Sequence, residues 1–182
     1  KIMNIWISSM ECAGIIEAGG VKNVTFSLCK EFADLGHKVT LFIPVFKTNS
    51  WDLITDLEKD FIKNVVIKHC GKEEQITLIE GDAAQVLAEL SGEYDLIFMD
   101  AAKGQYIHFL PDILRLLKPG GVLLSDNVLQ DGDVIQSRYA VTRRNRTIHG
   151  RMREYLYELK NHPQLQTSIL PVGDGITLSV KK

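Results

Sequence analysis

The stretch DLIFMDAAK, residues 95–103, constrains the fold of this chain more than any other. Four consecutive apolar residues stand between two acids and run into a turn of small residues, a pattern typical of a buried β-strand. In an open α/β sheet, ligands bind at the carboxyl ends of the strands. The strand is therefore expected to present Asp100 and Lys103 at a functional edge.

A second strand is predicted to bring oxygen ligands to the same edge. Residues 121–125, GVLLS, follow a helical stretch and run into Asp126 and Asn127. Carboxylate and amide oxygens suit a hard cation such as Mg²⁺, so Asp100, Asp126 and Asn127 are predicted to converge on one divalent cation. The simpler alternative is that such residues at strand ends only cap helices or turns.

The rest of the chain alternates between strand and helix patterns. This predicts an α/β fold with a Rossmann-like, doubly wound, mostly parallel sheet and a C-terminal antiparallel hairpin closed by the turn at 172–175. The length of 182 residues fits a single domain, 1–182. Strands are expected at 1–9, 38–44, 75–80, 95–100, 121–125, 167–171 and 176–180. Helices are expected at 21–35, 51–69, 84–90 and 107–117, and a last helix follows the basic stretch 138–153 and runs through Leu159. In the first helix, apolar residues up to Leu35 recur at helical spacing, which predicts a buried face, and Gly36 is expected to end the helix. A loop is expected around Gly132.

Composition narrows the class of protein. The net charge of -2 provides no overall attraction for nucleic acid or an anionic membrane. The three cysteines are far apart and form no CxxC pair, which favours reduced thiols in a cytoplasmic protein. No apolar run is long enough to span a bilayer, and no signal-peptide pattern is seen. His37, His69 and His149 show no metal-ligand spacing and receive no catalytic role.

From about residue 50 to 182 the sequence resembles the cation-dependent class I O-methyltransferases that use S-adenosylmethionine, the group of catechol and caffeoyl-CoA O-methyltransferases. The motifs that carry the resemblance are GDA (81–83), DAAKGQY (100–106), KPGG (118–121), SDNVL (125–129) and PVGDG (171–175). Within this group, DAAKGQY and PVGDGI look most like the bacterial branch that includes a tRNA 5-hydroxyuridine methyltransferase.

The resemblance implies roles for individual residues. Asp100, Asp126 and Asn127 would hold Mg²⁺ or a similar cation, and Lys103 would lie near the acceptor hydroxyl as the proton acceptor. Asp82 and Ala83 would contact the cofactor S-adenosylmethionine near its adenine, and Asp100 would also lie at the cofactor. For Asp82 the alternative is structural, because Gly-Asp-Ala after a strand also starts a helix well.

Residues 1–46 depart from this family. The first strand ends in Ile7-Ser8-Ser9 and the second in Ile43-Pro44-Val45-Phe46, whereas the family carries an acid after each of these strands. The loop containing EAGGV (17–21) and the run LGHKVT (35–40) instead resemble the first βαβ unit of glycogen and starch synthases. A chimera is therefore inferred, with a synthase-like segment at 1–46 and a methyltransferase-like body at 47–182. In that segment Gly14, Gly19 and Gly20 are candidate phosphate or cofactor contacts.

An arginine-rich stretch follows the predicted cation site. It contains Arg138, Arg143, Arg144, Arg146, Arg151 and Arg153. This stretch could hold a tRNA backbone with Tyr139 stacking on a base, or it could be a solvated loop and helix face.

Two kinds of partner are therefore expected: a small hydroxyl compound, phenol-like or catechol-like, or tRNA. A homodimer is left open, and no membrane partner is expected. The alternatives to an active methyltransferase are a folded but inactive chimera and a sugar-nucleotide-binding fragment.

Overall fold

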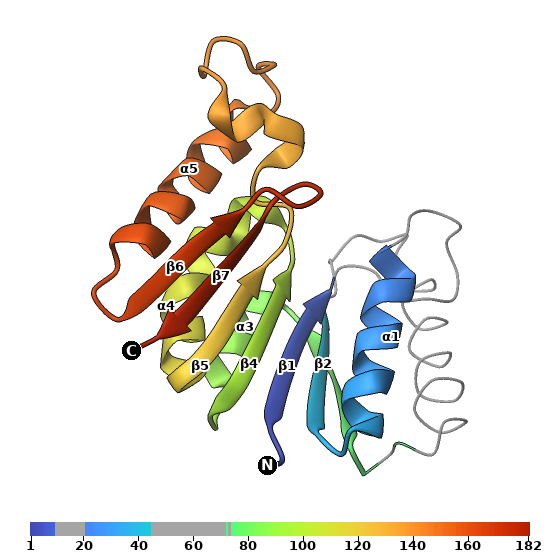
Figure 1. The fold of residues 1–182 in the computed structure, drawn as a ribbon. Helices are drawn as coiled ribbons and strands as arrows, with labels where there is room; N and C mark the ends of the chain where they lie inside the picture. Colours follow the sequence, from blue (N-terminus) through green and yellow to red (C-terminus); the bar gives the residue numbers. More distant parts are fainter. Residues whose placement is uncertain (10–20, 45–71, 73) are drawn as a thin grey trace. The chain divides into compact units, whose positions relative to one another are not determined.

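The computed structural model describes residues 1–9, 21–44, 72 and 74–182, which form two compact units (Figure 1). Unit 1 is Lys1–Glu89 and unit 2 is Leu90–Lys182. The helix expected at 51–69 and the glycine-rich loop at 10–20 lie outside the described residues.

Unit 1 contains β1 (Asn4–Ser9), α1 (Val21–Asp34), β2 (Lys38–Pro44), β3 (Ile76–Gly81) and α3 (Ala83–Glu89). Unit 2 contains β4 (Tyr94–Asp100), η2 (Lys103–Gln105), α4 (Tyr106–Leu116), β5 (Leu117–Ser125), η3 (Gln130–Ile135), α5 (Arg146–Asn161), β6 (Leu165–Leu170) and β7 (Ile176–Lys181).

Unit 1 is built on three parallel strands in the order β3-β2-β1. Ile5, Trp6 and Ile7 are buried one after another, as expected for a parallel strand covered on both faces. Trp6 stacks on Phe42 of β2 with ring centroids 5.9 Å apart. The helix α1 ends at Asp34, and Gly36 closes it as predicted. The φ of Gly36, 83°, is left-handed, and the His37 N–H returns to the Phe32 carbonyl at 3.0 Å.

Unit 2 carries the C-terminal half of the fold, with strand order β4-β5-β7-β6. The strands β4 and β5 are parallel, whereas β7 runs antiparallel to both β5 and β6, so the predicted hairpin is confirmed. Helix α5 packs against α4 and β6. Lys181 on β7 donates to the carbonyls of Leu114 and Leu117 at 2.6 and 2.7 Å, which satisfies backbone acceptors where α4 ends. The predicted α/β, Rossmann-like class is confirmed.

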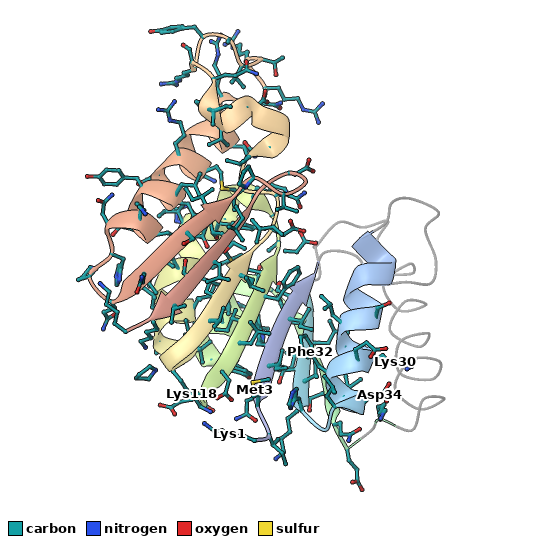
Figure 2. The ribbon with its side chains drawn as sticks, viewed as in Figure 1. Lys1, Met3, Lys30, Phe32, Asp34 and Lys118 are labelled. Carbon is teal, nitrogen blue, oxygen red and sulfur yellow. The ribbon has the colours of Figure 1, made fainter. Side chains whose placement is uncertain are left out.

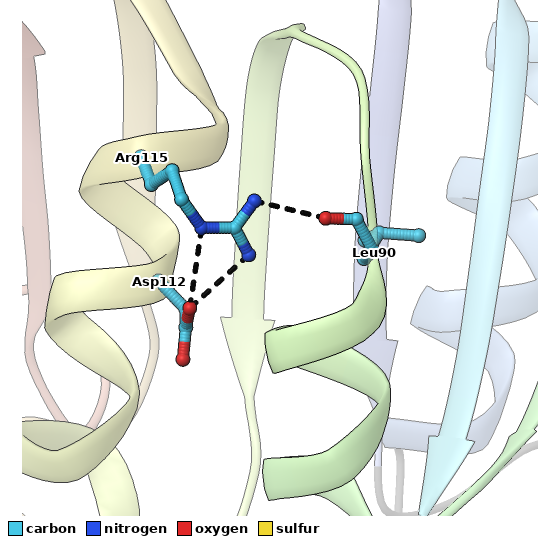
Figure 3. Close-up of polar contacts among 3 residues, drawn as sticks. All are labelled: Leu90, Asp112 and Arg115. Atoms are coloured by element: carbon cyan, nitrogen blue, oxygen red, sulfur yellow. Dashed lines mark hydrogen bonds and ion pairs between the residues drawn. The ribbon is translucent and has the colours of Figure 1, made fainter.

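Arg115 ties α4 to the segment that enters β4 (Figure 3). Its guanidinium donates from Nη1 to the Leu90 carbonyl at 2.9 Å, and from Nε and Nη2 to Asp112 Oδ1 at 3.3 and 3.1 Å. At the same end of the sheet, Lys118 pairs with Asp95 at 3.0 Å. These contacts lie at the amino end of β4, so they hold α4 and β5 in place without occupying the carboxyl end.

Three expectations about local structure are wrong. The strand β5 begins at Leu117 rather than residue 121, because Leu117 already pairs with Tyr94, with a register irregularity before Leu96. The loop expected around Gly132 contains the 3₁₀ helix η3. Leu35, expected on the buried face of the first helix, lies just beyond α1 and is 70% exposed, whereas Cys29 and Ala33 are fully buried.

Candidate active site

The pairing of β4 with β5 brings Asp100 and Asp126, which carry the two predicted carboxylates, to adjacent strand ends. Met99 is the register partner of Ser125, so Asp100 and Asp126 are the next residues on adjacent parallel strands. The Asp126 N–H donates to the Met99 carbonyl at 3.1 Å, which extends the pairing to this point. Neighbouring strands lie about 4.8 Å apart. Asp100 is only 8% exposed, which is unusual for a carboxylate and is the kind of burial found at functional sites.

Tyr106, the first residue of α4, links the ends of both strands. Its hydroxyl lies 3.2 Å from the carbonyls of Met99 and Asp126, to which it donates, and it accepts from the Ala101 N–H at 3.3 Å. Its ring packs edge-on against Tyr155, whose hydroxyl is 2.6 Å from Ser125 Oγ. One fully buried phenol therefore fixes the backbone from which both acids project.

The pKa of Tyr106 responds to the charges of Asp100 and Asp126. Burial raises the pKa of this phenol, and the charges of Asp100 and Asp126 act in the same direction, while the Ala101 N–H opposes them. The phenol is consequently a neutral donor throughout the physiological range. Both carboxylates lie close enough to act on the same hydroxyl.

Asn127 has a distinctive backbone and two polar contacts. Its φ of 52° is left-handed, a conformation that asparagine adopts more readily than most residues. Its backbone N–H donates to Asp126 Oδ1 at 2.7 Å, and its side-chain Nδ2 donates to Asp174 Oδ2 at 2.9 Å. The residue is thereby held immediately beside Asp126.

The turn at 172–175, between β6 and β7, packs on the segment that follows β5. The N–H groups of Val128 and Leu129 donate to the carbonyls of Gly175 and Asp174 at 2.9 and 2.8 Å. Gly175 has a φ of 85°, and a Cβ there would lie 2.8 Å from Leu129 Cβ. This close approach requires glycine.

Lys103 begins η2, three residues after Asp100, and is half-buried. The next residue, Gly104, is held by Arg151 of α5, which donates to its carbonyl at 3.1 Å. The structure thus places Lys103 on a supported turn at the carboxyl end of β4. Its role as proton acceptor stays a prediction.

The GDA motif lies in unit 1 and begins α3. Asp82 Oδ1 accepts from the N–H groups of Ala84 and Gln85 at 3.1 and 3.2 Å, so this carboxylate is the N-cap of the helix. Asp82 is exposed and Ala83 is half-buried. The structural role foreseen for Asp82 is therefore present, and its contact with a cofactor stays a prediction.

The donor set after β4 and β5 fits a hard cation in its chemistry. Two carboxylates and an amide provide oxygen ligands, which Mg²⁺ and similar ions prefer. Within the described ranges, no group of three or more His, Cys, Asp or Glu side chains is arranged to hold a metal. The predicted set contains only two such residues, because its third ligand is the amide of Asn127.

Three members of the arginine-rich stretch contact backbone carbonyl groups. Arg151 donates to the Gly104 carbonyl, Arg146 to the Val141 carbonyl at 3.3 Å, and Arg153 to the Gln136 carbonyl at 3.4 Å. Arg138, Arg143 and Arg144 are exposed, and so is Arg153. Tyr139 is 87% exposed beside them. In Figure 1 the orange loop that precedes α5 extends beyond the amino end of this helix.

Two residues of the site were missed in the sequence. Tyr106 and Asp174 stand inside the motifs DAAKGQY and PVGDG, but neither is a predicted ligand or catalytic group. A helical tyrosine is expected in a core, and an aspartate in a Gly-Asp-Gly turn is expected to stabilise that turn. Their presence within the two motifs was the available signal.

A family model described as O-methyltransferase matches residues 52–182. The chain belongs to this O-methyltransferase family. The family match contains the predicted catalytic, metal and cofactor residues from Asp82 to Asn127, whereas Gly14, Gly19 and Gly20 lie before it. Among curated relatives, the chain is 36% identical over 123 residues to a caffeoyl-CoA O-methyltransferase of Medicago sativa, covering 62% of this chain and 49% of that protein. It is 34% identical over 116 residues to tapetum-specific methyltransferase 1 of Arabidopsis thaliana, covering 62% and 50%. The chain thus spans about half the length of these curated relatives.

Two solved methyltransferase structures resemble this O-methyltransferase family member in fold over 99% of its chain. The methyltransferase PaMTH1 of Podospora anserina, bound to SAH, matches with a TM-score of 0.71 and 24% identity over 99% of this chain and 72% of that one. An O-methyltransferase of Bacillus cereus in complex with SAH matches with a TM-score of 0.68 and 21% identity over 99% and 74%. At these identities the likeness establishes the Rossmann-like methyltransferase fold. No helix in the described part of the chain is long and apolar enough to cross a membrane.

Proposed function

We propose that this chain transfers a methyl group from S-adenosylmethionine to a hydroxyl oxygen, assisted by a divalent cation bound to Asp100, Asp126 and Asn127. The observation that carries the proposal is the register of β4 and β5, which brings Asp100 and Asp126 to adjacent strand ends. Membership of the O-methyltransferase family supports the reaction class. We further propose that residues 1–182 form a single Rossmann-like domain.

In the proposed reaction the S–CH₃ bond of the cofactor breaks and an O–CH₃ bond forms, leaving S-adenosylhomocysteine and a methyl ether. A bound Mg²⁺ would lower the pKa of the acceptor hydroxyl and orient its oxygen. Asp100 and Asp126 hold their positions because Tyr106 fixes the backbone between them. We assign the hydroxyl proton to Lys103 Nζ, which would accept it as a neutral amine. This assignment is supported by the half-buried position of Lys103 at the start of η2, directly after the end of β4.

The cofactor is assigned to Asp82, Ala83 and Asp100. For Asp82 the assignment is supported by its exposure and by a helix cap that uses only one carboxylate oxygen, Oδ1. Replacing Asp82 with Asn keeps an oxygen for the cap and removes the charge. Weaker binding of S-adenosylhomocysteine by D82N, with an unchanged melting temperature, would therefore support a direct contact with the cofactor.

The competing function is a folded, inactive chimera, in which residues 1–46 derive from a synthase-like βαβ unit. It is favoured by the ends of the first two strands, because β1 ends in Ser8-Ser9 and β2 ends in Pro44, without an acid in either place. It is also favoured by the family match, which begins only at residue 52. Calorimetric titration with S-adenosylhomocysteine separates the two, with a nucleoside diphosphate sugar as control ligand. Micromolar binding, about -8 kcal/mol, supports the methyltransferase. Binding of neither ligand supports the inactive chimera, and binding of the sugar nucleotide alone supports a fragment of synthase type.

The acceptor is proposed to be a phenol-like or catechol-like compound, with tRNA as the second candidate. The arginine-rich stretch favours tRNA, because residues 134–153 contain six arginines and no acid in a chain of net charge -2. Exposed arginines bind phosphates, and exposed tyrosine stacks on unpaired bases. If tRNA binds there, the double variant R143A/R144A will weaken binding and reduce its salt dependence. The control K182A removes an exposed lysine outside the stretch and should leave both unchanged.

The direct test is methyl transfer from labelled S-adenosylmethionine to a panel of catechols and to tRNA. Asp126→Ala should abolish metal-dependent transfer, because it removes a proposed ligand. The matched control is Glu158→Ala, which removes an exposed acid on α5, away from the strand ends. Full turnover in D126A would refute the proposed mechanism.

A further inference from the structure

The side-chain amide of Asn127 could serve a cation in only one of its two orientations. An amide has a carbonyl oxygen, which can bind a cation, and an NH₂ group, which cannot. Rotation by 180° about the last side-chain bond exchanges the two. A site that uses Asn127 as a ligand therefore needs a neighbour that selects one orientation.

Asp174 is such a neighbour. Its Oδ2 accepts a hydrogen bond from Asn127 Nδ2 at 2.9 Å, across 47 residues of sequence. An ionised carboxylate only accepts hydrogen bonds, so the flipped amide would set its oxygen against a negative oxygen and lose the bond. With Nδ2 directed to Asp174, the carbonyl oxygen of Asn127 faces away from this carboxylate.

The position of the Asp174 carboxylate is itself fixed by backbone contacts. The Asp174 carbonyl accepts from the Leu129 N–H at 2.8 Å, and the Gly175 carbonyl accepts from the Val128 N–H at 2.9 Å. Within the turn, the Gly175 N–H returns to the Val172 carbonyl at 3.0 Å. None of these bonds uses the Asp174 side chain. A substitution at position 174 can therefore remove the carboxylate while the turn keeps its backbone contacts.

Asn127 is also restrained from its own side. Its left-handed backbone and the hydrogen bond from its N–H to Asp126 Oδ1 at 2.7 Å fix the position of its Cα and the direction of its Cα–Cβ bond. With the backbone set, the side chain can still rotate about its two bonds. The hydrogen bond from Nδ2 to Asp174 restrains this rotation and selects one orientation of the amide.

We propose that Asp174 is a positioning residue that orients the Asn127 amide so that its carbonyl oxygen is presented as the third ligand of a divalent cation. This inference rests on the proposed cation site and adds a residue to it. Partners that orient metal ligands typically change metal affinity about 10- to 100-fold when they are removed. The turn of the PVGDG motif thereby acquires a role in the site formed after β4 and β5.

Calorimetric titration of the metal-depleted protein with Mn²⁺ tests the proposal without any turnover. The variants are D174A, D174N, N127A and the double variant D174A/N127A. We expect D174A to weaken binding about 10- to 100-fold. D174N keeps an acceptor oxygen and should recover part of that loss. In the N127A background, D174A should cause no further loss, because Asp174 acts through Asn127.

The orientation can also be read in the protein without metal. The side-chain NH₂ signals of Asn127 in a nitrogen-15 spectrum are identified by their disappearance in N127A. Hydrogen bonding to Asp174 should slow their exchange with solvent in the wild type, and this protection should be lost in D174A. Equal exchange in the two proteins would overturn the proposal.

The remaining outcomes distinguish the inference from the function on which it rests. If Asp174 acted only through its charge, D174N and D174A would weaken Mn²⁺ binding equally. In that case D174A would also lower the affinity for Mn²⁺ in the N127A background as much as in the wild type. Either result overturns the positioning role. Wild-type affinity in D174A, with weak binding in N127A, overturns it while leaving the cation site intact. Absence of Mn²⁺ binding by the wild type would refute the cation site and the positioning role together.

Discussion

Replacing Gly175 with alanine should destabilise the protein much more than the same change at Gly173, two residues earlier in the same turn. Both glycines have left-handed backbones, with φ of 85° and 56°. An alanine at either position therefore carries a backbone cost of about 1–2 kcal/mol. The two positions differ in the space around them. A Cβ at 173 meets no atom within 4 Å, whereas a Cβ at 175 overlaps Leu129 Cγ and lies 2.8 Å from Leu129 Cβ and Cδ1.

The overlap at position 175 cannot be relieved by rotating a distant side-chain end, because Leu129 Cβ is bonded to the backbone. Overpacking of this kind costs about 1–3 kcal/mol. We therefore expect G175A to lose about 2–5 kcal/mol of unfolding free energy, and G173A to lose about 1–2 kcal/mol. Urea denaturation followed by circular dichroism measures both. G175A should also weaken Mn²⁺ binding, because the turn that carries Asp174 is displaced. Equal unfolding free energies for the two variants would show that the contact with Leu129 does not constrain the turn.

Three further predictions concern stability. Lys30 and Lys72, each 2.7 Å from Asp34, lower the pKa of the Asp34 carboxyl to about 2. Figure 2 shows Lys30 and Asp34 on α1. The two ion pairs should therefore stabilise the fold fully above pH ~4 and lose this effect as the pH falls towards about 2. D34N should remove that part of the acid dependence in thermal melts from pH 2 to 6, and an unchanged profile would contradict the ion-pair explanation. Y106F leaves the Ala101 N–H and two carbonyls without the phenol, so urea denaturation should show a loss of about 1–3 kcal/mol; wild-type stability would mean that these bonds contribute nothing. D82A removes the cap of α3 and should cost about 1 kcal/mol, whereas D82N should cost less; equal losses measured by calorimetric melting would argue against the cap.

The position of Asp100 and Asp126 at neighbouring strand ends was predictable because it needs only two local inferences. Each acid follows an apolar strand, and parallel strands of one sheet end at a common edge. The structure adds the register, Met99 opposite Ser125, which makes the two acids neighbours. The end of α1 was predictable for a similar reason, because Gly36 provides the left-handed residue that closes a helix.

The contact between Asn127 and Asp174 could not be predicted from local patterns. It depends on the antiparallel pairing of β5 with β7, in which Ser125 lies opposite Thr177. That pairing sets the turn against the segment after β5. The early start of β5 was missed for a related reason, since Pro119 and two glycines indicate a turn, yet Leu117 pairs with Tyr94 before them. Pairing between distant segments decided both features.

Metal dependence of the reaction can be measured as methyl transfer from labelled S-adenosylmethionine by metal-depleted protein, before and after addition of Mg²⁺. We expect negligible transfer to a catechol or tRNA acceptor in the depleted protein, restoration by Mg²⁺ in the wild type, and no restoration in D126A. Transfer by the depleted protein at the full rate, or restoration in D126A equal to that in the wild type, would contradict a cation site built from Asp100, Asp126 and Asn127.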